Sequence, residues 1–232
     1  SIPVKIDPDF LIDSIVELRF RESINSELVL GEAHSLLRQN GYRYLPGSMK
    51  SEDGKTALIK GAVLYSDVLK ISFQSNSIIF NHNKEYPTWQ YFKSNLMDAY
   101  KIIVDQGRIF SKPFRIGLRY INAFAELDVY EIINPKFAIS IPTFNLTGTH
   151  VKTEIVTPDH RIVLNLGNGF SVAGAKRSII DIDIIKELGE AHFFQIDELD
   201  AALDAVHGQE KELMFKHLLS EEYLKTLNVV FQ

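Results

Sequence analysis

Residues 113–122 read Pro-Phe-Arg-Ile-Gly-Leu-Arg-Tyr-Ile-Asn and carry the clearest strand pattern of the chain. Large apolar side chains at Ile116, Leu118 and Tyr120 alternate with other residues, as expected for a β-strand that buries one face. A similar run, Ile-Val-Glu-Leu-Arg-Phe-Arg, occupies residues 15–21, so the sequence Leu-Arg-aromatic occurs twice. This repetition predicts two related strands, one in each half of the chain.

The composition is that of an ordinary globular protein. The chain has 232 residues, of which 45% are hydrophobic and 24% are charged, and this length suits one large domain or two small ones. It contains no cysteine, which excludes disulfides, zinc–thiolate sites and cysteine nucleophiles. The formal net charge of −5 provides no overall positive field to attract nucleic acid.

The sequence also contains no membrane signal. No apolar run approaches the roughly 18 residues that span a bilayer. The first residues, Ser-Ile-Pro-Val-Lys, lack the charged and then apolar pattern of a signal peptide. We therefore expect a cytoplasmic protein with no membrane partner, and its oligomeric state stays open.

Hydrophobic periodicity and turn residues predict alternating groups of strands and helices. Predicted strands cover residues 14–21, 42–45, 58–65, 68–74, 77–82, 114–124, 150–156, 160–166, 169–175 and 178–186. Predicted helices cover residues 26–40, 88–107, 128–134 and 196–219, and Thr88 is expected to cap the second of them. The first 13 residues are expected to be extended without regular structure, and the chain end to be a short helix or irregular.

The order of these elements predicts an internal duplication. Both halves of the chain contain a strand, a helix, four strands and a helix. We therefore expect a single domain over residues 1–232, made of two pseudo-symmetric halves at 14–107 and 113–220. The alternative is that runs of strands between helices occur here by chance, since identity between the halves is slight.

This order of elements resembles the saddle of the TATA-box-binding protein fold. The resemblance implies an α+β protein with one continuous antiparallel sheet, in which the first strands of the two halves pair at the centre. It also implies long helices on one face and an open, concave second face. Fold likeness of this kind does not carry function with it.

A second resemblance covers most of the chain. The motifs are residues 15–20, 115–122, Asp-Ile-Asp at 181–183, Leu-Asp-x-x-His at 203–207 and Phe-x-x-Leu at 215–218. Together they resemble an uncharacterised, sporadically distributed prokaryotic protein family, with Arg-Ile-Gly-Leu-Arg-Tyr-Ile-Asn as the most specific part. The resemblance implies no established activity, and the scattered distribution hints at defence-linked genes. The chain departs from the family before the first strand, where it reads Asp-Pro-Asp-Phe.

Arg19 and Arg119 are the main candidates for ligand binding. Strand alternation places both on the open face, where two guanidinium groups could grip a phosphate or carboxylate. The alternative is that each arginine pairs with a carboxylate on a neighbouring strand. For Arg119 the expected internal partner is Asp181 or Asp183, and the sequence favours this alternative.

Asp181 and Asp183 are also candidate metal ligands. Two carboxylates two residues apart on one strand can share a hard cation such as Mg²⁺. A third acidic ligand is needed, and no known motif supplies one. His207 and Asp204 share one face of the last predicted helix, and the sequence favours a polar packing pair or a solvated face for them over acid–base chemistry.

No catalytic arrangement stands out, so the sequence favours a non-enzymatic binding or adaptor protein without excluding an enzyme. The open sheet face or a helical surface would hold a partner, and the acidic balance favours a protein over nucleic acid. Two alternatives stay open. One is a metal-dependent enzyme on a phosphorylated substrate, with Arg119 as anion clamp and Asp181 and Asp183 as metal ligands. The other is a small-molecule sensor. No cofactor is predicted.

Overall fold

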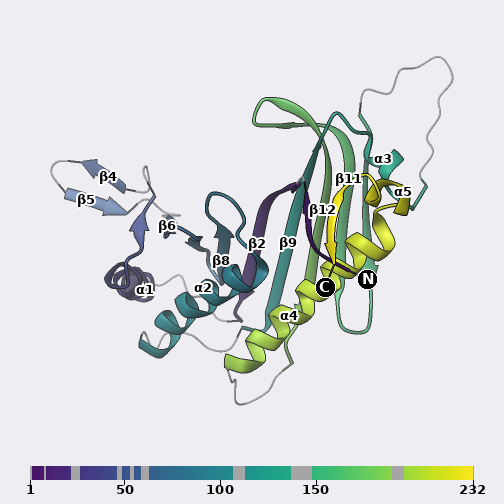
Figure 1. Ribbon diagram of the computed structural model, residues 1–232. Helices are drawn as coiled ribbons and strands as arrows, with labels where there is room; N and C mark the ends of the chain where they lie inside the picture. Colours follow the sequence, from purple (N-terminus) through teal and green to yellow (C-terminus); the bar gives the residue numbers. More distant parts are fainter. Residues whose placement is uncertain are drawn as a thin grey trace. The chain divides into compact units, whose positions relative to one another are not determined.

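The protein is an α+β fold with one large antiparallel sheet of nine strands (Figure 1). The computed structural model describes residues 2–7, 9–21, 27–45, 49–52, 55–58, 63–106, 113–136, 148–189 and 196–231. The predicted class and the antiparallel sheet are therefore confirmed. Residues 107–112, where the sequence predicted the boundary between two halves, lie outside the described ranges.

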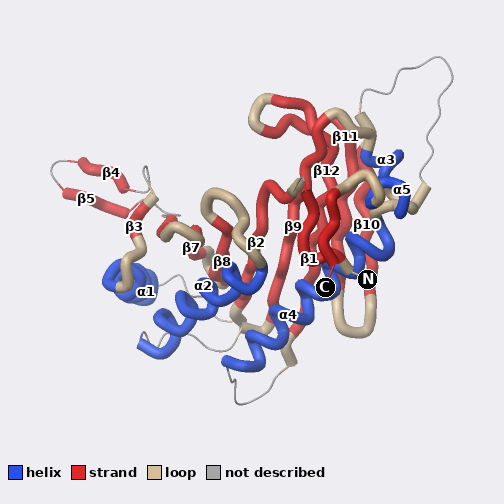
Figure 2. The backbone as a smooth tube through the Cα atoms, in the orientation of Figure 1, coloured by secondary structure: helices blue, strands red, loops and turns tan. Residues whose placement is uncertain are grey.

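The strands form one sheet and two separate ribbons. In spatial order, the sheet consists of β10 (His150–Val156), β11 (Arg161–Val172), β12 (Ala175–Glu187), β9 (Arg115–Ala125), β2 (Leu11–Arg19), β8 (Ser77–His82), β7 (Leu69–Phe73), β6 (Val63–Tyr65) and β3 (Arg43–Tyr44). The two-stranded ribbons, also visible in Figure 2, are β1 (Pro3–Asp7) with β13 (Asn228–Phe231) and β4 (Met49–Glu52) with β5 (Lys55–Leu58).

The helices lie close to their predicted positions. They are α1 (Glu27–Gln39), α2 (Trp89–Lys101), α3 (Val129–Ile132), α4 (Ile196–Glu212) and α5 (Glu221–Leu224), with π-helical extensions η1 (Ile102–Gln106) and η2 (Leu213–Leu218). Thr88 caps α2 as its sequence predicts, because its side chain accepts a hydrogen bond from the Tyr91 backbone amide. Within the described ranges, every helix is too short or too polar to cross a lipid bilayer.

The chain divides into two compact units, each assembled from distant stretches of sequence. Unit 1 consists of Ser1–Asp13, Arg119–Ile185 and Asp204–Gln232. Unit 2 consists of Ser14–Leu118 and Lys186–Leu203. Each unit is described by itself below.

In unit 2 the alternation of β2 separates a buried face from a partly exposed face. Val16, Leu18 and Phe20 have no exposed surface. Glu17 and Arg19 point to the other face, and their side chains are 18% and 32% exposed. The hydrophobic effect thus fixes which way the strand faces, because a slip of one residue would bury both charges.

In unit 1 the even-numbered residues over 178–184 of β12 and 120–124 of β9 are buried. Ile180, Ile182 and Ile184 of β12 are fully buried. On β9, Tyr120 is 5% exposed, and its hydroxyl is hydrogen-bonded to Nδ1 of His207 on α4 at 3.1 Å. The even-numbered face of β9 is therefore turned toward α4, which fits the packing role that the sequence favoured for His207.

Residues 167 and 168, which separate the predicted strands 160–166 and 169–175, lie instead inside the long strand β11. The strand continues through a bulge between Gly167 and Phe170. Asn168 holds this bulge, because its Oδ1 accepts from the Val129 amide at 3.0 Å and the Ser178 hydroxyl at 2.8 Å. The chain reverses later, at Ala173 and Gly174, which have φ values of 49° and 81° and close a two-residue hairpin loop. The second group of strands therefore contains three members rather than four.

The chain ends also differ from expectation. Residues 1–13 contain β1 and the start of β2, and the last described residues form β13, which pairs with β1 in antiparallel fashion. Figure 1 shows this ribbon beside the two labelled ends of the chain. Backbone pairing between segments more than 200 residues apart satisfies amide groups that the sequence alone gave no reason to connect.

Candidate functional site

Arg119 of β9 forms a bidentate ion pair with Asp181 of β12 in unit 1. Its Nε and Nη2 atoms donate to the two carboxylate oxygens of Asp181, each at 2.8 Å. Asn165 of β11 lies opposite Asp181 in the strand register and donates a third hydrogen bond to Oδ2 at 3.0 Å. The internal partner that the sequence favoured for Arg119 is thus present.

Burial and charge make this pair a stable feature of unit 1. The Asp181 side chain is only 7% exposed, whereas that of Arg119 is 43% exposed. The hydrogen bonds with Asp181 raise the pKa of the Arg119 guanidinium above its usual value, more than burial lowers it, and the charges of Asp183 and Asp13 add to the effect. Two parallel bonds give this pair both strength and a fixed geometry. Any external anion would have to compete with a carboxylate already in place.

Arg19 of β2 lies in a different arrangement, in unit 2. Its Nη2 donates to Oε1 of Glu17 on the same strand at 2.8 Å. Nη2 of Arg115 on β9 donates to Oε2 of the same carboxylate at 3.0 Å. One carboxylate is therefore shared by two guanidinium groups, and the cluster carries one excess positive charge.

The shared carboxylate is strongly held but does not satisfy both arginines. Burial by itself would raise the pKa of the Glu17 carboxyl, but the hydrogen bonds from Arg19 and Arg115 outweigh it, so that its pKa lies below the usual value. The Nε atoms of Arg19 and Arg115 are buried and have no hydrogen-bond partner among the described residues. Unfilled donors beside an excess positive charge favour an additional acceptor.

The structure gives Asp181 and Asp183 no shared metal environment. Both oxygens of Asp181 already accept hydrogen bonds from Arg119. In the part of the chain that the structure describes, no group of three or more acidic, histidine or cysteine side chains is arranged to hold a metal ion. A cation at Asp181 would have to displace Arg119, and metal binding there stays a prediction.

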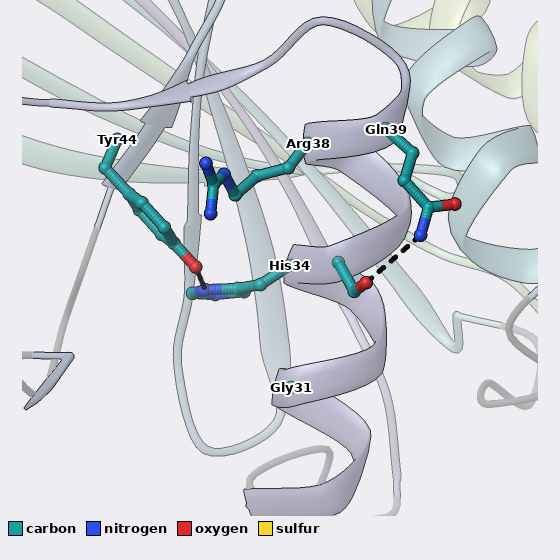
Figure 3. A pocket seen from close by; sticks show the side chains of 6 residues that line it. Gly31, His34, Arg38, Gln39 and Tyr44 are labelled. Carbon is teal, nitrogen blue, oxygen red and sulfur yellow. Dashed lines mark hydrogen bonds between the residues drawn. The ribbon is translucent and has the colours of Figure 1, made fainter. Parts of the chain in front are cut away.

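Unit 2 also contains an open pocket of about 420 Å³ between α1 and Tyr44 of β3 (Figure 3). Its lining residues are Gly31, His34, Ser35, Arg38, Gln39 and Tyr44. Nδ1 of His34 and the Tyr44 hydroxyl are hydrogen-bonded at 3.1 Å, and the Arg38 guanidinium lies over the Tyr44 ring, 5.3 Å from its centre. Two aromatic rings and one cation thus define one wall of the pocket.

Burial changes the pKa values of both rings, the His34 imidazole and the Tyr44 phenol. Burial lowers the pKa of His34, which is 6% exposed. Burial raises the pKa of Tyr44, and the nearby Arg38 charge opposes that change. At neutral pH the wall is therefore a neutral imidazole and a neutral phenol, and Arg38 supplies the formal charge of the lining.

No residue of this pocket was predicted as a site from the sequence. His34 lies beside Ala33 on the buried side of α1 and near Leu37, at a spacing typical of a core stripe. The one available signal was a histidine and an arginine four residues apart, which share a helix face. The spacing alone does not predict a site, because the pocket also requires Tyr44 of β3, which lies against the same helix face.

The chain shows no match to the models of known protein families, and no curated protein matches it either. Inference about its function therefore rests on the chemistry of these three places, two arginine–carboxylate clusters and one pocket.

Proposed function

We propose that this chain is a non-enzymatic binding or adaptor protein that holds a partner protein at the Arg19 cluster, defined as Arg19, Glu17 and Arg115. The observation that carries the proposal is the sharing of one carboxylate by two arginines. The cluster has one uncompensated positive charge and two unfilled Nε donors. An aspartate or glutamate of a partner would compensate this charge at the exposed part of the Arg19 guanidinium, whose side chain is 32% exposed.

The charge of the whole chain favours a protein over nucleic acid as this partner. A net charge of −5 opposes the approach of a polyanion, whose binding depends on many simultaneous phosphate contacts. A single acidic side chain needs only the local positive charge of the Arg19 cluster. The Arg119 pair plays no direct part in this proposal, since Asp181 occupies its guanidinium fork.

The proposal includes an internal duplication of the fold, with helices on one face of the sheet and with three strands, rather than the predicted four, in the second group. The strand order supports it, because β2 and β9, the first strands of the two predicted halves, are neighbours in the sheet. β2 is then followed by β8 and β9 by β12, the last strand of each half. Membership of the prokaryotic family that residues 115–122 resemble, and a defence-linked role, belong to the same proposal.

The test compares single arginine substitutions in the full chain. Arg19→Gln and Arg115→Gln each remove the excess charge, whereas Arg161→Gln removes an exposed arginine paired with Glu154 at 3.4 Å and serves as the matched control. Each variant is used to recover bound proteins from native-host extract, and the partner is then titrated in purified form. We expect partner affinity to fall by about tenfold or more for Arg19→Gln, and to be unchanged for Arg161→Gln.

Two results would contradict the proposal. One is a partner whose affinity is the same for Arg19→Gln, Arg115→Gln and wild type. The other is a complex that disappears on nuclease treatment and weakens steeply with salt, which would identify nucleic acid instead. Thermal unfolding of each variant shows whether a loss of binding reflects loss of structure.

A further inference from the structure

The α1 pocket, defined by its six lining residues, has the size of a small-molecule site. Its volume of about 420 Å³ lies in the range of roughly 300–1,000 Å³ that is typical for such ligands. The space next to Gly31 is empty, since a Cβ atom added there would meet no other atom within 4 Å. A longer side chain at this position would therefore enter empty space rather than the protein core.

The chemistry of the lining suits an anion. Three of its side chains carry hydrogen-bond donors on α1, namely Ser35, Arg38 and Gln39. The Gln39 amide donates one of its N–H groups to the Ser35 hydroxyl at 3.3 Å, which leaves its second N–H and the Ser35 O–H as donors for a ligand, and Figure 3 shows Arg38 and Gln39 beside the pocket. The lining contains no aspartate or glutamate. Arg38 forms no ion pair with any residue that the structure describes, in contrast to Arg19, Arg115 and Arg119.

The aromatic wall holds Arg38 ready for such a ligand. The cation–π contact with the Tyr44 ring, 5.3 Å from the guanidinium carbon to the ring centre, restricts the guanidinium without engaging its N–H donors in a hydrogen bond or ion pair. Tyr44 is itself fixed through its hydroxyl by the buried His34. An arginine positioned in advance loses less conformational freedom when it binds an anion.

We propose that the α1 pocket binds a small molecule that carries a carboxylate or phosphate group. Arg38 contacts the anionic group, Ser35 and Gln39 donate hydrogen bonds to it, and the space above Gly31 accommodates the rest of the molecule. This site is separate from the Arg19 cluster, so it does not depend on the proposed function, and the two can fail independently.

The test uses defined probes and amide NMR spectra of the full chain. Benzoate and phenyl phosphate supply the two anionic groups on the same ring, inorganic phosphate supplies the anion alone, and benzamide is the neutral control. We expect saturable shifts at Arg38, Gln39 and Tyr44 with at least one anionic ring compound and none with benzamide. The ratio of the benzoate and phenyl phosphate affinities identifies the preferred anion.

Three variants connect the shifts to the pocket. Arg38→Gln should weaken binding by about tenfold or more, while Arg43→Gln, which changes an exposed arginine on the adjacent strand β3, should leave it unchanged. Gly31→Leu should abolish binding without lowering the melting temperature, since leucine fits the open space and favours the helix.

Several outcomes would overturn the proposal. One is the absence of saturable shifts at the pocket with every anionic probe, and another is binding that survives both Arg38→Gln and Gly31→Leu. Binding of an acidic peptide at Arg38 where the small anions fail would assign the pocket to a protein partner instead. Because Gly31→Leu is expected to keep the fold, it tests the pocket even if Arg38→Gln fails to fold.

Discussion

Glu210 should make this protein less stable as the pH rises through neutrality. It lies on α4 in unit 1 and is only 3% exposed. Leu203 and Val206, two turns and one turn before it, are fully buried, and Met214, one turn after it, is 2% exposed. Burial raises the pKa of the Glu210 carboxyl to about 8, and the charge of the neighbouring Lys211 offsets only part of this effect.

The direction of this pH dependence follows from the different pKa values of Glu210 in the folded and unfolded states. The unfolded chain releases the Glu210 proton near pH 4.5, while the folded protein keeps it until about pH 8. Between these values the unfolded state gains about 1.4 kcal/mol per pH unit relative to the folded state. At pH 7 this single carboxyl therefore lowers the free energy of unfolding by about 3 kcal/mol, a large fraction of the total for a domain of this size.

The substitution Glu210→Gln removes the titration and nearly preserves the shape of the side chain. The free energy of unfolding of Glu210→Gln minus that of wild type should rise by about 3 kcal/mol between pH 5 and pH 8. Other carboxyls, including Glu17 with its lowered pKa, titrate in both proteins and cancel in this difference. Glu222→Gln, which changes an exposed carboxyl on α5, is the matched control and should show a flat difference.

Urea unfolding at a series of pH values measures these differences. Circular dichroism follows both units, and fluorescence of Trp89, the single tryptophan, follows unit 2 in particular. Coincident transitions would show that the units unfold together and that one free energy describes the chain. A difference between Glu210→Gln and wild type that does not change with pH would refute the reasoning, since the buried carboxyl would then ionise in the folded state at no cost.

Three further substitutions test local features by the same urea measurement. Thr88→Ala should lower the free energy of unfolding by about 1 kcal/mol because the Tyr91 amide loses its acceptor; equal losses for Thr88→Ala and Thr88→Ser would contradict this. Gly41→Ala should cost about 1 kcal/mol, since Gly41 has a φ of 91°, and a neutral effect would mean that alanine escapes this backbone conformation. Asp181→Ala should cost about 2 kcal/mol, because it leaves Arg119 without its acceptor. Adding Arg119→Ala to Asp181→Ala should then cost little more, whereas additive losses would show that the two residues do not interact.

Elements with a strong local signal were predictable from the sequence. β8 (Ser77–His82) and β10 (His150–Val156) have the predicted bounds, and α1 (Glu27–Gln39) lies inside its predicted range. In these segments the periodicity and the turn residues point to the same structure. The cap at Thr88 was predictable for the same reason, since its hydrogen bond spans only three residues.

Features that depend on distant partners were not predictable. β1 acquires its structure from β13 at the other end of the chain, and neither segment carries a distinctive alternation. Gly167 and Gly169 have the composition of a turn, but contacts of Asn168 with Asp128 and Ser178 keep the chain extended there. Tertiary hydrogen bonds thus override the local preference of glycine for a reversal.

The candidate sites divide in the same way. Strand alternation together with the resemblance to the saddle fold, which makes 178–186 the neighbour of the central strand, led to the expectation that Arg119 pairs with Asp181 or Asp183. It gave no reason to expect that Arg115, from β9, would join Arg19 at Glu17. Two residues on one strand that share a face, as Glu17 and Arg19 do, make an ion pair possible in any such sequence, whereas the third member depends on the alignment of separate strands.

In the two copies of Leu-Arg-aromatic the side chains therefore face the same way, but the two arginines differ in how their hydrogen-bond donors are paired. In each copy the leucine and the aromatic ring are buried and the arginine lies on the opposite face. The buried Asp181 accepts hydrogen bonds from both Nε and Nη2 of Arg119, so the positive charge of Arg119 is neutralised within unit 1. At Arg19 the Glu17 carboxylate is shared with Arg115, and the Nε donor of each arginine has no hydrogen-bond partner among the described residues. The substitution Asp181→Asn tests this difference, because it removes the carboxylate that pairs with Arg119. Gain of anion binding at Arg119 would show that the internal acceptor, rather than the Leu-Arg-aromatic motif, decides which arginine binds a partner.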